Sequence, residues 1–272
     1  MRASRELINS LPSFHNHFGN CATGQPILGL CLELYAYILI TNSYKPRGLG
    51  PGHTVEYDDF VMCLSNLGTF ATFGTMFGDF HGLFELIPRI TLFAAQRLTE
   101  EASGDLLPSP ESRTMKNLLE QQIDQWVLDH AVTRNNILWK QATEAAGAAE
   151  AMHHALRIYL ATALAGSIVS DEWMRSLIQG HIDAIISATQ MVSNSQFATL
   201  LLWPLLVAGS CMTDPGQQHR LILSLKGSRY HMKHVFRVCD VLQRMWQTES
   251  AHAYGPYGLF LMQQMGYSFP VL

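Results

Sequence analysis

The chain has 272 residues, of which 48% are apolar and only 15% are charged, and its formal net charge is −4. About a quarter of the residues in a typical soluble domain are charged, so this composition indicates either a large buried interior or an exposed apolar face that meets a partner. A domain that holds DNA by itself is expected to be basic. The negative charge therefore argues against direct nucleic-acid binding by this chain.

The cysteines and the apolar runs argue against two further classes of protein. Five cysteines are present, an odd number, and no pair has the C-x-x-C spacing. This pattern speaks against a disulfide scaffold and against a cysteine-rich zinc module. The longest apolar runs, at residues 156–169 and 197–211, are shorter than the ~20 residues that cross a bilayer. We therefore expect a soluble protein that does not enter a membrane.

The first third of the chain predicts three helices separated by loops. Residues 1–26 are mostly polar and are expected to be irregular. Residues 27–40 form a long apolar segment that favours a buried helix, and residues 60–73 follow a proline- and glycine-rich loop as a second helix. The pattern of residues 83–98 predicts a third helix, kinked in its first turns by Pro88.

The middle third predicts three more helices after a polar surface loop at residues 99–110. The first of these three helices is expected to begin near Pro110. Residues 142–163 are rich in alanine, the best helix former, and residues 171–191 are amphipathic. The expected apolar face after Pro110 consists of Met115, Leu118, Leu119, Ile123, Trp126, Val127 and His130. The expected apolar face of residues 171–191 consists of Trp173, Leu177, Ile178, Ile182, Ile185 and Ile186.

The last third centres on residues 197–211, which are hydrophobic on nearly every side and predict a helix buried inside a larger bundle. Pro204 lies within this segment and is expected to kink it. Asp214 is a good N-cap and Pro215 suits the first position of a following helix, which should stop at Gly227. A short last helix is expected at residues 255–266. Another helix is expected before it, because the following apolar residues occur at helical spacing: Met232, Val235, Phe236, Cys239, Leu242, Met245 and Trp246.

These elements together predict an all-α protein, an irregular multi-helix bundle of roughly ten to twelve helices. No fixed-period repeat and no series of short alternating strands occurs in the sequence. The length is compatible with one large domain, which we place at residues 27–272 after the irregular segment 1–26.

Four short motifs, in order along the chain, resemble those of one protein family. The most specific is the run Trp203–Gly209 (WPLLVAG), with Arg220 eleven residues further on and Trp246 after the next helix. The other three are a G-L-x-x-L-I helix within residues 80–92, an A-x-x-I-Y-L helix at residues 155–160, and a closing segment at residues 265–268. This combination resembles the fungal-specific regulatory domain of Zn₂Cys₆ (binuclear zinc cluster) transcription factors.

The resemblance implies a helical regulatory region that works through dimer contacts, effector sensing or coregulator binding, and it transfers no catalytic residue. Trp203, Pro204, Gly209 and Arg220 are therefore interpreted as structural positions. Gly209 has no Cβ, so it would let two helices approach closely. Arg220 would pair with an acidic group or with a helix C-terminus. No cofactor and no metal ion is expected.

The family's DNA-binding module, an array of six cysteines that holds two zinc ions, has no counterpart in this sequence. The resemblance thus implies a regulatory part that lacks its zinc cluster. The expected location is the nucleus, with the cytoplasm as the alternative. Other proteins or a second copy of the chain are the expected partners, and a small-molecule effector is a further candidate.

Histidine pairs raise the question of a zinc site. His231 and His234 lie three residues apart on one helical face, but neither an H-E-x-x-H motif nor a third ligand accompanies them. His153 and His154 are adjacent in a helical segment and are expected to point apart. The sequence therefore favours ordinary core or surface histidines.

Two enzyme classes have partial signatures in the sequence. Asp58 and Asp59 resemble half of the magnesium-binding motif of helical terpene cyclases, but the third acidic residue is absent and a helix N-cap role is favoured. Residues 48–52 are rich in glycine but lack the lysine of a phosphate-binding loop.

A transcription-regulator domain is thus the main hypothesis. The alternative is a stand-alone small-molecule-binding protein or enzyme, with a role in secondary metabolism and a pocket of ~300–1,000 Å³. A terpene-cyclase-like enzyme is the third hypothesis.

Overall fold

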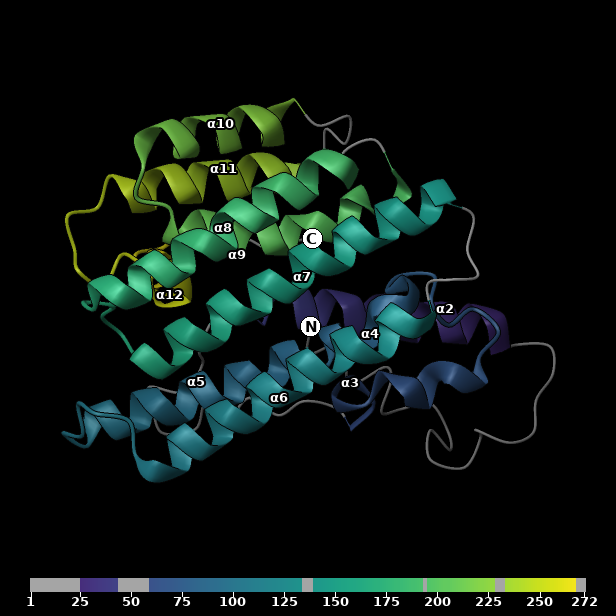
Figure 1. Ribbon diagram of the computed structural model, residues 1–272, viewed down its shortest axis with the longest axis horizontal. Coiled ribbons are helices and arrows are strands. Elements are labelled where there is room, and N and C mark those ends of the chain that lie inside the picture. The colour runs from purple at the N-terminus through teal and green to yellow at the C-terminus, as the bar shows by residue number, and fades with distance from the viewer. Residues whose placement is uncertain (1–24, 44–58, 134–138, 193–194, 228–232, 268–272) are drawn as a thin grey trace.

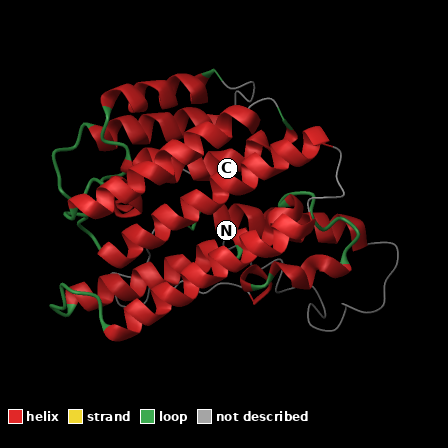
Figure 2. Cartoon of the chain, viewed as in Figure 1, coloured by secondary structure: helices red, strands yellow, loops and turns green. Residues whose placement is uncertain are grey.

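The computed structural model of this protein describes residues 25–43, 59–133, 139–192, 195–227 and 233–267. Within these ranges every regular element is a helix, as Figures 1 and 2 show. The α-helices are α2 (Gln25–Thr41), α3 (Asp59–Met62), α4 (His81–Phe84), α5 (Leu86–Ala102), α6 (Pro110–Thr133), α7 (Trp139–Ala165), α8 (Glu172–Val192), α9 (Leu202–Cys211), α10 (Pro215–Lys226), α11 (Lys233–Trp246) and α12 (Gly255–Gln264). The 3₁₀ helices are η1 (Leu64–Thr69), η2 (Gly78–Phe80) and η4 (Gln196–Leu201). The all-α prediction is confirmed.

Helix α7 runs through the middle of the bundle (Figure 1). It packs most extensively against α8 and also contacts α5, α6 and α9. Helices α5 and α6 lie together on one side of α7, and α10 and α11 lie together on the other (Figure 1). Small side chains on α7 allow these close approaches, because its buried face includes Ala148, Ala149, Ala151, Ala155 and Ala163.

Helix α9 is the most enclosed element, since all of its residues are buried. It contacts α7, α8, α10, α11 and α12. A helix with neighbours on all sides has no polar face, which explains why the sequence between residues 202 and 211 is almost uniformly apolar. The prediction of a helix buried inside the bundle is therefore confirmed for this segment.

Both prolines that were expected to kink a helix instead mark a helix start. Pro88 and Pro204 each occupy the third helical position, in the tripeptides Leu-Ile-Pro of α5 and Leu-Trp-Pro of α9. The backbone N–H groups of the first turn have no intrahelical partner, so proline removes no bond there. The chain changes geometry just before each helix: α4 ends at Phe84 and η4 ends at Leu201. Residues 197–211 are thus a 3₁₀ turn followed by an α-helix, and the prediction of a kinked helix was wrong.

The helix expected at residues 60–73 is also replaced by shorter pieces, α3 and η1. Gly68 lowers the helix propensity of this stretch. A side chain from another part of the chain then caps η1: the Glu85 Oε1 atom accepts hydrogen bonds from the backbone N–H groups of Leu64 (2.6 Å) and Ser65 (3.4 Å). Sequence periodicity carries no information about such a long-range cap.

Several apolar side chains that were expected in the core lie at the surface. They are Met115, Leu118 and Val127 of α6, Trp173 and Leu177 of α8, and Phe236 of α11. These helices lie on the outside of the bundle, so each buries a narrower stripe than its sequence pattern indicates. The side chain of His130 lies outside the described residues. No helix in the described ranges is both long enough and apolar enough to cross a membrane.

Candidate functional site

Trp203 and Pro204 lie in the first turn of α9, inside the core. The Trp203 ring meets the ring of Tyr159 from α7 edge-on, with the two centroids 6.0 Å apart. The Tyr159 hydroxyl, in turn, is 2.9 Å from Thr91 Oγ1 of α5. These contacts connect α9 to α7 and α7 to α5, so this part of the motif holds the bundle together.

Gly209 lies at the closest approach of α9 to α10 and α11. A Cβ atom at this position would be 2.8 Å from Leu221 Cδ2 and 2.8 Å from Leu242 Cδ1. The indole Nε1 of Trp246 donates a 2.9 Å hydrogen bond to the Gly209 carbonyl oxygen. The absence of a side chain at Gly209 therefore sets how closely α10 and α11 pack on α9.

We expect Trp246→Phe to lower the free energy of unfolding by about 1 kcal/mol, because it removes the hydrogen bond to Gly209 and keeps an aromatic ring. Urea unfolding followed by far-ultraviolet circular dichroism measures the change. Trp173→Phe is the matched control, since the Trp173 side chain is 68% exposed. Equal stability losses in the two variants would contradict this role of Trp246.

A cavity with a volume of about 400 Å³ opens between α8, α9 and α10. We call this cavity the α8–α10 groove. Its lining residues are Ile186, Thr189, Gln190, Leu205, Gln217, Arg220, Leu221 and Ser224. The volume falls within the usual range of small-molecule sites, and the lining combines apolar side chains with a few polar groups, as such sites do.

Arg220 carries the only charge among these lining residues. It is an exposed residue of α10, at the mouth of the groove. No hydrogen bond or ion pair joins its guanidinium to another residue in the described part of the chain, so the acidic partner expected from the sequence is not found there. The Arg220 donors therefore face the solvent and the groove.

Three polar side chains tie α10 to α8 beside the groove. The Gln217 amide nitrogen donates to Asp183 Oδ1 at 2.8 Å, and Gln179 donates to Gln217 Oε1 at 3.0 Å and to Asp183 Oδ1 at 2.9 Å. The start of α10 is fixed as well, because Asp214 accepts a 2.7 Å hydrogen bond from the Gln217 backbone N–H. This confirms Asp214 as the N-cap and Pro215 as the first residue of the helix. Gly227 caps its end with φ −81°, so no left-handed residue is used there.

A second polar cluster lies between α6, α7 and α8. The Nδ1 atoms of His154 and His181 are 2.9 Å apart, and the rings of His153 and His154 are 5.1 Å apart and edge-to-face. The prediction that His153 and His154 point apart was therefore wrong. His181 comes from the next helix, and nothing in the sequence indicated its contact with His154.

Burial holds these histidines neutral at pH 7. It lowers the pKa of His153 and that of His181 to about 4, with smaller effects from the charges of His154 and Arg157. Burial also lowers the pKa of His154. Arg157 is paired with Glu120 and Asp124 of α6. In the described ranges no group of three histidine, cysteine or carboxylate residues has a geometry that would hold a metal ion.

The histidine cluster predicts a loss of stability in mild acid. The folded pKa values lie below the unfolded value of about 6.5, so the unfolded state binds more protons between pH 6.5 and pH 4. The neutral histidines therefore contribute fully to the free energy of unfolding above pH 6.5, and this contribution is lost as the pH falls towards 4. The total loss is about 2 kcal/mol after allowance for partial solvent exposure. Urea unfolding at a series of pH values gives the unfolding free energy as a function of pH. Between pH 6.5 and pH 4 this free energy should change less steeply with pH in His181→Gln than in the unsubstituted chain. An unchanged slope would contradict the assignment.

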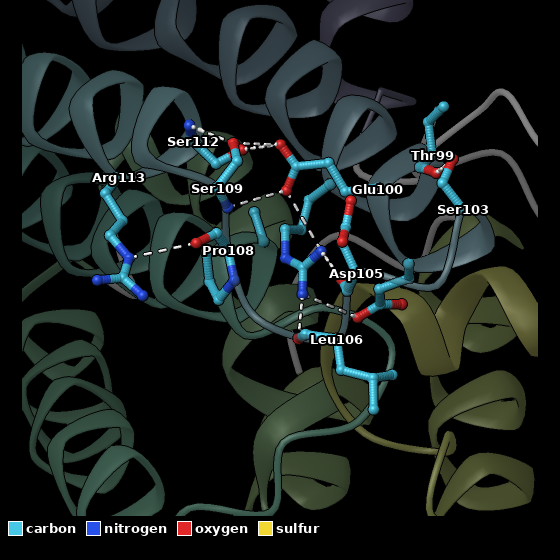
Figure 3. Close-up of polar contacts among 12 residues, drawn as sticks. Thr99, Glu100, Ser103, Asp105, Leu106, Pro108, Ser109, Ser112 and Arg113 are labelled. Atoms are coloured by element: carbon cyan, nitrogen blue, oxygen red, sulfur yellow. Dashed lines mark hydrogen bonds and ion pairs between the residues drawn. The ribbon is translucent and has the colours of Figure 1, made fainter.

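A third polar cluster joins the end of α5 to the start of α6 (Figure 3). The Glu100 carboxylate accepts hydrogen bonds from the hydroxyls of Ser109 (2.7 Å) and Ser112 (2.6 Å). Buried Arg97 bonds to the carbonyl oxygens of Asp105 (3.0 Å) and Leu106. These hydrogen bonds join the end of α5 to the loop and the start of α6, so the cluster orders the connection between the two helices.

The remaining candidates from the sequence contribute little to a site. Asp58, His231 and residues 48–52 lie outside the described residues. Asp59 is the first residue of α3, and His234 lies half-buried on α11. Neither Asp59 nor His234 is among the residues that line the α8–α10 groove.

Comparison with known proteins identifies the family. The family model of the fungal specific transcription factor domain matches residues 1–256. The chain belongs to this family. Neither the curated proteins nor the solved structures gave a match. The matched range includes Trp203–Gly209, Arg220 and every lining residue of the α8–α10 groove, so this groove lies within the fungal transcription factor domain.

Proposed function

We propose that this fungal transcription factor domain is a regulatory domain that acts in the nucleus and alters transcription by binding an effector or a partner protein. Family membership supports the general role, and the net charge of −4 speaks against direct contact with DNA. The observation that carries the finer proposal is the α8–α10 groove, whose one charged lining residue, Arg220, belongs to the motif that resembles the family signature.

The position of the groove connects its occupancy to the outer helices. Helix α10 forms one wall of the groove, and Gly209 holds α10 and α11 close to α9. Each of the two outer helices exposes a large apolar side chain, Leu223 on α10 and Phe236 on α11. A ligand that shifts α10 relative to α8 would therefore move surface groups of the kind that a protein partner contacts.

A reporter assay tests the proposed function. The full chain is fused to an unrelated DNA-binding domain, and the output of a reporter gene with the matching operator is measured. We expect a several-fold difference from the DNA-binding domain alone, in either direction. The control fuses the same DNA-binding domain to a helical protein with no role in transcription. Equal outputs from both fusions and the DNA-binding domain alone, at equal nuclear abundance, would overturn the proposal.

The second candidate is a stand-alone small-molecule-binding protein, which the same 400 Å³ cavity would serve. This candidate predicts ligand binding without any effect on the reporter. The reporter assay and a binding assay together therefore separate the two functions.

A further inference from the structure

We propose that the α8–α10 groove binds a small organic acid, with the ligand carboxylate on the Arg220 guanidinium and the carbon skeleton against Leu205 and Leu221. This inference rests on the proposed function, because it names the chemical class of the effector. It follows from the charge of the groove, the donors of Arg220 and Ser224, and the apolar wall of the groove.

The charge of the groove selects an anion. Arg220 is the one charged side chain in the lining, and no carboxylate lines the described cavity. A guanidinium presents parallel N–H donors that match the two oxygens of a carboxylate. Ser224 follows Arg220 by one helical turn on the same face of α10 and supplies a hydroxyl donor beside it. A phosphate dianion would be less well matched, because only one cation is present to balance it.

The nearest acidic groups are already engaged elsewhere. Asp183 accepts hydrogen bonds from Gln179 and Gln217, and Asp214 caps the start of α10 through the Gln217 backbone. Asp214 and Arg220 both lie close to Gly216, yet no ion pair joins them in the structure. A ligand carboxylate therefore does not have to displace an existing partner from the Arg220 guanidinium.

The opposite part of the groove is apolar. Ile186 of α8, Leu205 of α9 and Leu221 of α10 line it. Leu221 is held in place by its contact with Gly209, and Leu205 and Leu221 are both buried. Burying a hydrocarbon chain against these side chains contributes roughly 25 cal/mol per Å² of apolar surface removed from water. The groove thus suits an acid that carries an aliphatic group rather than a fully polar acid such as oxalate.

Isothermal titration calorimetry on the full chain at neutral pH tests this inference. The probes are hexanoate, its neutral analogue hexanamide, and hexylammonium, which share a carbon chain and differ in charge. We expect hexanoate to bind and hexylammonium not to bind. The affinity for hexanamide should be lower than that for hexanoate by a factor of about ten or more. Arg220→Gln should weaken hexanoate binding to the level of hexanamide. Arg237→Gln, which removes an exposed arginine of α11, is the matched control and should leave binding unchanged.

Three outcomes would overturn the inference: no binding of any probe at millimolar concentration, equal binding of hexanoate and hexanamide, or full hexanoate binding by Arg220→Gln. Because Arg220 is exposed and unpaired in the described structure, Arg220→Gln should keep the melting temperature of the unmodified chain. The result is also distinct from that of the reporter assay. A chain that changes transcription but binds no probe refutes only this inference, and a chain that binds hexanoate but leaves the reporter unchanged refutes only the proposed function.

Discussion

Arg97→Met is expected to lower the free energy of unfolding by about 3–5 kcal/mol. The Arg97 side chain is 0% exposed, and its guanidinium lies 3.3 Å from Glu100 and 3.8 Å from Glu101. Methionine keeps much of the apolar stem and removes the charge and the donors. The loss therefore measures the buried polar contacts rather than a cavity.

Removal of the Arg97 guanidinium takes away hydrogen-bond donors and a positive charge from the groups around it. The carbonyl oxygens of Asp105 and Leu106 lose their donors, and the two glutamates lose a nearby positive charge. Burial favours the protonated form of Glu100, but hydrogen bonds from Ser112 and Ser109 and the charge of Arg97 outweigh it and lower the pKa of this carboxyl. A carboxylate that stays ionised in partial burial without Arg97 is costly. The connection between α5 and α6 should loosen (Figure 3).

Urea unfolding of Arg97→Met and of Arg113→Met measures this contribution. Arg113 is exposed and makes a single 3.3 Å hydrogen bond to the Pro108 carbonyl oxygen, so its substitution should cost no more than about 1 kcal/mol. A loss below about 1 kcal/mol for Arg97→Met as well would mean that its buried contacts do not stabilise the fold.

Trp203→Ala should lower the free energy of unfolding by about 3–5 kcal/mol, because it empties a large, fully enclosed volume at the start of α9. The side chain is 1% exposed and packs on Tyr159. Its Nε1 atom has no hydrogen-bond partner among the described residues. Both substitutions remove this unpaired donor, and phenylalanine keeps most of the ring volume, so Trp203→Phe should cost clearly less than Trp203→Ala.

The same unfolding measurement compares these two variants with Trp173→Ala. Trp173 lies at the surface of α8, so its removal should change the unfolding free energy by no more than about 0.5 kcal/mol. Trp203→Ala and Trp173→Ala would have equal effects if the first tryptophan were not part of the core. Both substitutions remove the indole nitrogen, so equal losses for Trp203→Ala and Trp203→Phe would show that the ring volume at this position does not determine the stability.

The all-α class and most helix positions were predictable because local signals determine them. Asp214 and Pro215 specify a helix start by their own hydrogen-bonding chemistry, and residues 202–211 are apolar on all sides because α9 is enclosed. Alanine-rich α7 was expected for its propensity, and its small side chains also serve the close packing of its neighbours. In each case the information lies within a few residues of the feature that it predicts.

The wrong predictions concern features that local sequence signals do not determine, because these features depend on how distant segments pack together. Pro88 and Pro204 were expected to kink helices, because the sequence does not show that a helix begins two residues earlier. Trp173 was expected in the core, because periodicity does not show how wide a stripe α8 buries. Of the α8–α10 groove, the sequence identified Arg220 alone and assigned it a structural role. The groove is formed by three helices, and no local motif specifies its other lining residues.

The measurement that tests the central claim most directly is the reporter output of the Arg220→Gln fusion, compared with the unsubstituted fusion and with the Arg237→Gln fusion. If the α8–α10 groove is the regulatory site, Arg220→Gln changes the output, Arg237→Gln leaves it unchanged, and all three proteins have the same abundance and melting temperature. Identical output from all three fusions, each differing from the DNA-binding domain alone, would show that the domain regulates transcription through another surface and would contradict the assignment of the groove.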